Sequence, residues 1–493
     1  MDRTAERRIG ARSFARLLGD WRPPEGRGLA DALAERIRLL VLDGRLPLHT
    51  RLPAERELAA AIGVSRTTVA TSYDALRGEG VLRSRRGAGS WTQLPAGPPD
   101  DAGPAPFSPL GDDALYDLAH AAPSAPSAAL RAAAAAAVRD LDVLLAGHGY
   151  DLSGQPALRA AIAARYTARG LPTSPDQVLV TAGAVHGIHL ALTVLAGPGD
   201  RVLVEHPTYP NALGAITTRG ARPVPVPMAP DADGRSRWDL DLLTSAVRDA
   251  APRLAYLIPD FQNPTGALLD DADRARLVEL ARRTGTPLLV DETLTDLALD
   301  GQEVVPVAAH GAADSPLVLS IGSASKSFWG GLRIGWIRTS AAMVRRLAAA
   351  RAGVDLGGPA LEQLTVARLL AEHDEQVLAE RRHELAAARD HLLGRLARTF
   401  PGWRPSRPTG GLALWVDLGR PESSRLTAAA RRHDVLLAAG PRFGLDGAFE
   451  RYLRLPYTLR PDRLDEAVDR LAAAWAALDR AGPAFEGEPV AVA

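Results

Sequence analysis

The chain has 493 residues with 58 basic and 58 acidic side chains, so its formal net charge is zero. It contains no cysteine, which excludes disulfide bonds, thiolate nucleophiles and cysteine-based metal sites and is typical of a cytoplasmic protein. We expect no metal centre. The most apolar run, residues 128–141, is interrupted by Arg131 and Arg139 and therefore predicts a water-soluble helix instead of a membrane span.

The length predicts two or more domains, and the composition changes along the chain. Residues 1–95 hold 17 Arg against 11 Asp and Glu, so the basic excess of this part is balanced by an acidic remainder. A basic domain favours an anionic partner. We expect an N-terminal extension at 1–28, a small domain at 29–93, a proline-rich linker at 94–113, a large domain at 114–482 and a tail at 483–493. Within the large domain we expect a large subdomain at about 150–355 and a small one at about 356–482.

The small domain shows three helical patterns followed by a hairpin pattern. Residues 28–44 place apolar side chains on one helical face, and residues 52–63 form a short helix between a proline and a glycine. Residues 64–80 predict a third helix with Ser65 as its N-cap, and residues 81–92 predict two short strands around a glycine-rich tip. In the extension we expect a short helix from about Ser13 to Leu18.

Three helices and a basic hairpin predict a winged helix-turn-helix, whose second motif helix enters the major groove of DNA. The side chains at the start of that helix would then meet bases and phosphates, and the arginines of the wing would reach the backbone or the minor groove. These DNA-binding candidates are Ser65, Arg66, Thr67, Thr68, Arg85 and Arg86. The alternative is a generic three-helix bundle with solvated arginines.

Residues 52–91, "LPAERELAAAIGVSRTTVATSYDALRGEGVLRSRRGAGSW", resemble the GntR-type DNA-binding domain. The resemblance implies that Arg56, Arg66 and Thr68 contact DNA and that Gly87 and Gly89 shape the wing. One departure is Ala54, because the family usually has a serine there that caps the second helix. The loss of such a cap costs about 1 kcal/mol of stability.

From about residue 115 onward, apolar strand patterns alternate with helical patterns. Each strand pattern ends in polar or turn residues, as in 177–183, 200–210, 253–266, 286–294 and 316–326. This alternation predicts an α/β fold with a largely parallel sheet. Ligands of such sheets bind beyond the carboxyl ends of the strands, so we expect Tyr209, Asn263, Asp291 and Lys326 to lie around one opening.

Lys326 is the only lysine of the chain, while 57 positions carry arginine. A primary amine forms an imine with an aldehyde, and a guanidinium does not. Ser323, Ser325 and Arg333 surround this lysine in the sequence and have the donors that bind a phosphate. With Asp291 as the partner of a pyridine nitrogen, the set matches the requirements of pyridoxal 5'-phosphate.

The order and spacing of these motifs resemble fold-type-I aminotransferases over residues from about 115 to 480. The resemblance implies that Lys326 forms the aldimine with the cofactor and that Ala184 and Val185 cradle the phosphate through their backbone, together with Ser323, Ser325 and Arg333. It further implies that Tyr209 stacks on the ring, Asn263 binds the ring hydroxyl, Asp291 pairs with the ring nitrogen and Arg454 binds a substrate carboxylate. Tyr150 would reach a phosphate across a dimer interface.

Three positions depart from the family pattern. Thr293 and Ile321 stand where the family often has tyrosine, and Asn211 stands where some relatives carry an arginine that binds a carboxylate. Taken singly, Tyr209 is as compatible with packing, Asn263 with a turn and Arg454 with a surface role. The substrate or effector therefore stays open at the level of sequence.

A GntR-type domain, a proline-rich linker and an aminotransferase-like domain together resemble the MocR subfamily of bacterial regulators. This implies a homodimeric transcriptional regulator that binds double-stranded DNA and pyridoxal 5'-phosphate and senses the cofactor or a small amine or amino acid. Two alternatives stay open. One is an active aminotransferase with a DNA-binding appendage, and the other is a DNA-binding protein whose large domain has lost the cofactor.

Overall fold

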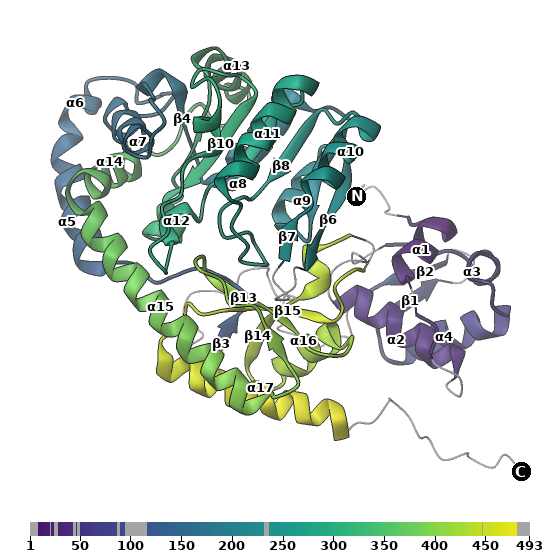
Figure 1. The fold of residues 1–493 in the computed structure, drawn as a ribbon. Coiled ribbons are helices and arrows are strands. Elements are labelled where there is room, and N and C mark those ends of the chain that lie inside the picture. Colours follow the sequence, from purple (N-terminus) through teal and green to yellow (C-terminus); the bar gives the residue numbers. More distant parts are fainter. Residues whose placement is uncertain are drawn as a thin grey trace, which may run out of the picture. The chain divides into compact units, whose positions relative to one another are not determined.

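The computed structural model describes residues 8–19, 21–23, 28–42, 46, 50–85, 89–93, 116–230, 236–445 and 447–480. The expected linker at 94–113 and the expected tail at 483–493 lie outside these residues. The chain forms two compact units, which are described separately: Leu118–Val416 with Arg454–Glu466, and Met1–Asp117 with Asp417–Leu453 and Ala467–Ala493. Figure 1 shows the element labels used below.

The described residues of the N-terminal domain form four helices and a two-stranded sheet. These elements are α1 (Ala11–Leu18), α2 (Leu29–Leu42), α3 (Glu55–Ile62), α4 (Arg66–Gly78), β1 (Leu82–Arg85) and β2 (Gly89–Thr92). The apolar faces of the helices meet in one core, as their sequence patterns predict. The expected helix near Ser13–Leu18 is α1, and its Phe14 and Leu18 are fully buried in this core.

Local sequence signals set the helix-turn-helix. Gly63 ends α3 in the left-handed conformation (φ 67°), and two residues later the Ser65 side chain caps α4 by accepting a hydrogen bond from Thr68 N at 3.0 Å. Ala54 precedes α3 without a side-chain cap, as expected from its missing hydroxyl. Strands β1 and β2 pair antiparallel from Leu82↔Thr92 to Arg85↔Gly89, which forms the predicted wing.

The large sheet has the strand order β4-β11-β10-β9-β8-β5-β6-β7. The strands are β4 (Val178–Thr181), β5 (Arg201–His206), β6 (Arg222–Pro230), β7 (Ser236–Trp238), β8 (Leu254–Leu257), β9 (Leu288–Asp291), β10 (Val318–Ser323) and β11 (Gly335–Arg338). Neighbours from β10 to β6 pair in parallel, whereas β11 is antiparallel to both β10 and β4. The predicted, largely parallel α/β sheet is therefore confirmed.

Helices cover both faces of this sheet. On β11, Trp336 donates a hydrogen bond to Tyr166 of α7 (Pro156–Ala168), while the next residue, Ile337, lies against Gly187 of α8 (Ala184–Leu195). Consecutive side chains of a strand point to opposite faces, so α7 and α8 lie on opposite sides. The other helices of this unit are α5 (Ser127–Asp140), α6 (Asp142–Leu145), α9 (Pro210–Thr218), α10 (Leu240–Ala250), α11 (Asp271–Thr284), α12 (Ala324–Ser327), α13 (Ala341–Arg351), α14 (Ala360–Arg368) and α15 (Asp374–Thr399).

A second, five-stranded sheet has the order β12-β13-β15-β14-β3. Its strands are β3 (Tyr116–Leu118), β12 (Arg404–Pro405), β13 (Ala413–Asp417), β14 (Val435–Ala439) and β15 (Tyr452–Pro456), and the remaining helices are α16 (Ser423–Arg431) and α17 (Pro461–Arg480). The strand predicted within residues 410–418 is β13. No helix in the described part of the chain has the length and apolar content needed to cross a membrane.

Candidate functional site

Lys326 lies on α12, directly after strand β10. Its Nζ donates a hydrogen bond to the carbonyl oxygen of Ala121 at 2.8 Å. Burial lowers the pKa of Lys326 to about 8, and the positive charges of Arg454 and Arg333 act in the same direction, while Asp291 opposes them. The environment thus raises the fraction of this amine that is neutral and nucleophilic, compared with an ordinary lysine.

Asp291 is the last residue of β9 and is buried. Its Oδ2 accepts a hydrogen bond from Tyr256 Oη at 2.7 Å, and its Oδ1 accepts from Thr293 N at 3.1 Å and Thr293 Oγ1 at 2.7 Å. Burial raises the pKa of Asp291, and the hydrogen bonds from Thr293 and Tyr256 and the charge of Lys326 limit the rise. Thr293, which stands where the family pattern often has tyrosine, therefore holds the Asp291 carboxylate in place through two hydrogen bonds.

The turn between β4 and α8 meets Arg333. Gly183 has a φ of 83°, and a Cβ atom at this residue would lie 2.7 Å from Arg333 Nη2. Arg333 itself is left-handed (φ 53°) and donates from Nη2 to the carbonyl of Ala182 at 3.3 Å. Ala184 and Val185 begin α8, so their backbone N–H groups and the guanidinium gather at one helix N-terminus, a favourable place for a phosphate.

Ser323 and Ser325 occupy the turn that leads to Lys326. Ser323 Oγ caps α12 by accepting a hydrogen bond from Ser325 N at 3.1 Å. The hydroxyl of Ser323 is buried and also donates to Ile334 O at 3.5 Å. Ser323 thus shapes the turn, and Ser325 is the more accessible of the two hydroxyls.

Tyr209, Asn263 and Arg454 complete the opening at the carboxyl ends of the strands. Arg454 Nη1 donates to Asn263 Oδ1 at 3.2 Å, and Asn211 Nδ2 donates to Tyr209 Oη at 2.8 Å. Burial and then the charge of Asp291 raise the pKa of Tyr209, while Arg454 and Arg333 are among the opposing influences. The expected residues Tyr209, Asn263, Asp291, Lys326, Arg333 and Arg454 are therefore neighbours in one site.

Tyr150 is not part of this cluster within the single chain. It is 67% exposed, and its ring packs at a tilt against His148 with the ring centroids 5.5 Å apart. Its expected role needs a second subunit.

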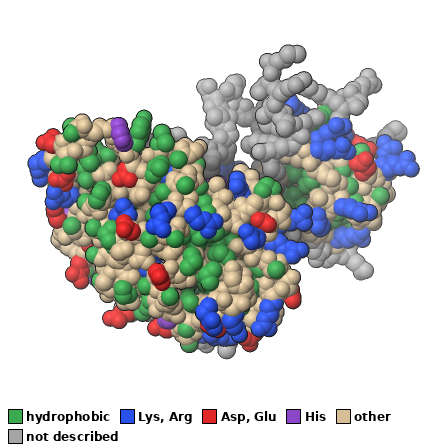
Figure 2. Space-filling view, turned by 90° about the horizontal axis from the view of Figure 1, so that it is seen from above, with side chains coloured by type: hydrophobic (Ala, Val, Ile, Leu, Met, Phe, Trp, Pro, Cys, Tyr) green, Lys and Arg blue, Asp and Glu red, His purple; other side chains and the backbone are tan. Residues whose placement is uncertain are grey.

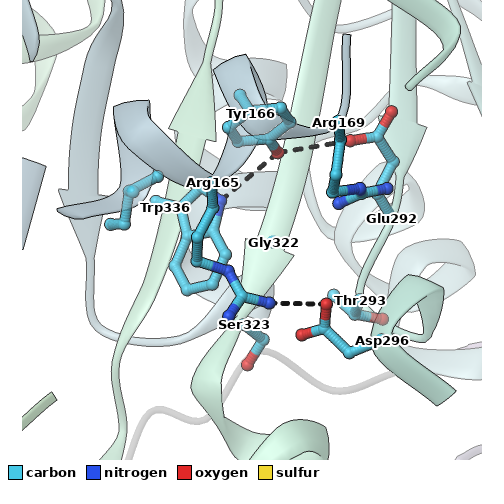
Figure 3. A pocket seen from close by; sticks show the side chains of 10 residues that line it. Arg165, Tyr166, Arg169, Glu292, Thr293, Asp296, Gly322, Ser323 and Trp336 are labelled. Atoms are coloured by element: carbon cyan, nitrogen blue, oxygen red, sulfur yellow. Dashed lines mark hydrogen bonds and ion pairs between the residues drawn. The ribbon is translucent and has the colours of Figure 1, made fainter. Parts of the chain in front are cut away.

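A network of polar side chains contacts the turn that carries Lys326, and Figure 3 shows its ion pair between Arg165 and Asp296. Ser327 Oγ donates to Asp296 Oδ2 at 2.6 Å, and Arg165 Nη2 of α7 donates to Asp296 Oδ1 at 2.6 Å. Figure 3 shows Tyr166 bonded to both Glu292 and Trp336 beside this ion pair, around a cavity of about 10 Å³. The cavity holds about one water molecule, so the network acts as packing and support. Sequence reasoning missed it because its members come from distant segments.

The composition of the site fits pyridoxal 5'-phosphate. Lys326 supplies an amine of lowered pKa, Asp291 a buried carboxyl group, and Arg333 with the α8 N-terminus a cationic cradle that glycine at position 183 leaves open. Arg333 and Arg454 add two positive charges near Lys326 against the one carboxyl group of Asp291, so an anionic cofactor would neutralise the excess positive charge. Among the described residues, no group of three His, Cys, Asp or Glu side chains could hold a metal ion.

The candidate DNA-binding surface lies at the start of α4. Ser65, Arg66 and Thr67 are exposed there, as is Arg56 on α3. Arg66 Nε lies 3.3 Å from Glu55 Oε2, an exposed ion pair that a phosphate can replace at low cost. Figure 2 shows basic side chains at the surface, with acidic ones interspersed on the larger unit.

In the wing, Gly89 has a φ of 119°, and a Cβ atom there would lie 2.8 Å from Arg51 Nε. The backbone conformation at this position therefore favours glycine. Arg86, Gly87 and the side chain of Arg85 lie outside the described residues, so their expected roles stay predictions.

Comparisons with known proteins match two parts of the chain to two family models. Residues 29–91 match the model of the bacterial regulatory proteins of the gntR family. Residues 116–471 match the model of aminotransferase class I and II.

The similar proteins include transcriptional regulators and aminotransferases. The uncharacterized HTH-type transcriptional regulator YisV of Bacillus subtilis is 27% identical over 85% of this chain and 90% of its own length. The probable rhizopine catabolism regulatory protein MocR of Rhizobium meliloti is 31% identical over 62% of this chain and 64% of its own. The crystal structure of LysN, an alpha-aminoadipate aminotransferase of Thermus thermophilus complexed with N-(5'-phosphopyridoxyl)-L-leucine, is 29% identical, with a TM-score of 0.68 over 75% of this chain and 94% of that one.

Proposed function

Because this chain belongs to the aminotransferase class I and II family and carries a gntR-family DNA-binding domain, we propose that it is a transcriptional regulator of the MocR type. Its aminotransferase-like part binds pyridoxal 5'-phosphate and senses the cofactor or a small amine or amino acid. One observation carries the proposal: a helix-turn-helix with exposed polar residues occurs in the same chain as a lysine of lowered pKa that lies near a buried aspartate and an arginine-lined helix N-terminus.

Each cofactor-binding residue has a specific role in this proposal. When bound, the cofactor supplies an aldehyde that captures amines and a ring that withdraws electrons. Lys326 holds the aldehyde carbon, and Asp291, positioned by Tyr256 and Thr293, holds a proton at the ring nitrogen. Tyr209 stacks on the ring and Asn263 binds its hydroxyl group.

The phosphate is held by backbone and side-chain donors together. Ala184 and Val185 contribute N–H groups at the start of α8, and Arg333 contributes charge. Ser325 and Ser323 add hydroxyl groups on the other side. Arg454, which donates to Asn263, binds the carboxylate of an amino-acid effector.

The regulator acts as a homodimer in this proposal. Two segments that are joined by the Asp151↔Gly357 bridge expose large apolar side chains. Val143 is 84% exposed, Leu145 72%, Tyr150 67% and Val354 64%. Exposed apolar patches of this kind mark interaction surfaces, and a second copy that covers them brings Tyr150 to the other subunit's phosphate. Two DNA-binding domains then read two half-sites.

On DNA, Arg56, Arg66 and Thr68 contact phosphates and bases, and Ser65 and Thr67 add hydrogen bonds at the start of α4. Arg85 and Arg86 extend the contact from the wing, whose shape depends on Gly87 and Gly89. The exposure of Arg56, Ser65, Arg66 and Thr67 supports this assignment.

The proposal is tested by the visible absorbance of the purified protein and by its binding to its own upstream DNA. We expect an absorbance band that disappears in Lys326→Ala, and a DNA affinity that changes when an amino acid alters this band. A protein without the band after incubation with pyridoxal 5'-phosphate would contradict the proposal.

A second candidate function is amino-group transfer, since relatives of this chain include aminotransferases such as LysN. The two functions differ in turnover. Sustained conversion of an amino acid and a keto acid by the purified protein would favour the enzyme, and a single half-reaction at most is expected of the regulator.

A further inference from the structure

Residues Ala119–Ser124, which we call the strap, follow directly after β3 and lie against the candidate cofactor site. No residue of the strap belongs to a helix or a strand. Pro123 has no N–H donor and favours extended backbone, and Pro126 follows two residues after the strap. Side chains from the surrounding elements contact the strap.

Three basic side chains from three elements hold the strap by its carbonyl oxygens. Lys326 Nζ donates to Ala121 O at 2.8 Å, and Arg454 Nη2 of β15 donates to Ala119 O. Arg381 Nη2 of α15 donates to Ser124 O at 2.6 Å and also to Phe328 O at 3.0 Å. The first two holders are the proposed ligand groups of the site, whereas the third is not.

Ligands and the strap therefore compete for the same donors. A guanidinium binds a carboxylate more strongly than it binds a neutral carbonyl oxygen, so a carboxylate on Arg454 displaces Ala119. A Lys326 amine that is engaged by the cofactor is likewise not available to Ala121, and an amine that displaces Lys326 from the cofactor makes it available again. Each ligand group thus controls one attachment of the strap.

We propose that the strap converts ligand binding into a signal for the DNA-binding domain. At its N-terminal end the chain continues through β3 and the expected linker at 94–113 into that domain, so release of the strap changes the tether of the domain. This inference rests on the proposed function. It also defines the effector class, because a compound with both an amine and a carboxylate acts on both attachments, and a simple amine leaves Arg454 on Ala119.

The chain has no native cysteine, so a single introduced one can be labelled selectively. Ala122 is an exposed strap residue whose side chain makes none of the three holding contacts, and Ala128 is an exposed residue at the start of α5. We suggest Ala122→Cys and, as its control, Ala128→Cys, each with a nitroxide label on the cofactor-loaded protein.

The probe is the standard amino acid that changes the cofactor absorbance most, compared with the amine that lacks its carboxylate and the acid that lacks its amine. We expect label mobility at position 122 to rise with the amino acid and not with the amine, while position 128 stays unchanged. Arg454→Gln should abolish the difference between the amino acid and the amine.

A label at position 122 that does not respond, in a protein whose absorbance and DNA affinity both respond to the amino acid, would overturn the role of the strap and leave the proposed function intact. If no amino acid changes absorbance or DNA affinity, the proposed function fails and the strap mechanism fails with it.

Arg381 provides a second test that leaves the ligand groups untouched. Arg381→Gln weakens the third attachment, so the effector competes against a looser strap and we expect its half-maximal concentration for the DNA response to fall several-fold. Arg398 is an exposed residue of the same helix α15, which makes Arg398→Gln the matched control. The same half-maximal effector concentration in both variants and in the wild type would contradict the proposal.

Discussion

The DNA-binding domain and the cofactor site use charged residues in opposite ways. In the N-terminal domain, Arg56 and Arg66 are exposed at the surface of a domain with an apolar core. Their side-chain length and their charge therefore decide what they bind. In the cofactor site, Asp291 is buried, burial raises its pKa, and burial lowers the pKa of Lys326 to about 8. The first region is built to meet a partner at its surface, and the second to change the chemistry of its own side chains.

This difference predicts how each region responds to mutation. Loss of an exposed arginine removes one contact among several, so its effect on binding is partial. Loss of the lysine removes the only amine of the site, so its effect is complete. The predictions below run from the largest expected effect to the smallest.

Lys326→Ala should abolish the covalent attachment of pyridoxal 5'-phosphate. Borohydride treatment of the wild type should fix the mass of the cofactor on the peptide that contains Lys326, and the variant should show no added mass. Lys326→Arg keeps a positive charge but has no imine-forming amine, so it should behave like Lys326→Ala. Cofactor mass retained in either variant would contradict the role of this lysine.

Phe14→Ala should destabilise the N-terminal domain by about 3–5 kcal/mol, because Phe14 is fully buried in its core. DNA binding should then be lost at a lower temperature than in the wild type, while the cofactor absorbance persists. The control is Arg12→Ala, an exposed position on the same helix. Simultaneous loss of DNA binding and cofactor absorbance would mean that the two regions do not unfold independently.

Arg66→Ala should weaken DNA binding by about 1–3 kcal/mol and leave the cofactor absorbance unchanged. Fluorescence anisotropy with labelled upstream DNA measures this loss. Arg248→Ala removes the same charge from an exposed position on α10 and serves as control. Equal losses in both variants would show that only total charge matters.

The pH dependence of cofactor capture should report the environment of Lys326. A lowered pKa means that the amine becomes neutral at a lower pH, so the rate of capture by cofactor-free protein should rise through pH 8 and level off above it. A free lysine would require a pH near 10.5. A stopped-flow absorbance series over pH measures the inflection.

Two substitutions should move this inflection in opposite directions by smaller amounts. Arg454→Gln removes a positive charge that lowers the pKa of Lys326, so the inflection should rise. Asp291→Asn removes a negative charge that raises the pKa, so the inflection should fall. Shifts of the same sign in both variants would contradict the electrostatic account.

Much of this organisation could be predicted from the sequence because the signals are local. The glycine and serine at positions 63 and 65 mark the turn between α3 and α4, and apolar runs that end in polar residues mark strands β5, β9 and β10. Parallel strands bring their carboxyl ends together, which is why Asp291 and Lys326 were expected at one opening. The short helix near Phe14 was also expected, although its place in the core was not.

Other features have no local signal. The strap is held through the carbonyl oxygens of Ala119 and Ala121. Every residue has a backbone carbonyl, so the sequence does not indicate which of them accept these hydrogen bonds. Tyr256 looks like one more apolar position of β8 until its hydroxyl is found 2.7 Å from Asp291. The ion pair of Arg165 and Asp296 joins segments 131 residues apart, which only the fold brings together.

The most direct test of the account is the affinity of the cofactor-loaded protein for its own upstream DNA, measured by anisotropy with and without the amino acid that alters the cofactor absorbance. The account predicts that the affinity of the wild type changes on addition of the amino acid and that the affinity of Lys326→Ala does not. An unchanged affinity in the wild type, or the same change in both proteins, would contradict it.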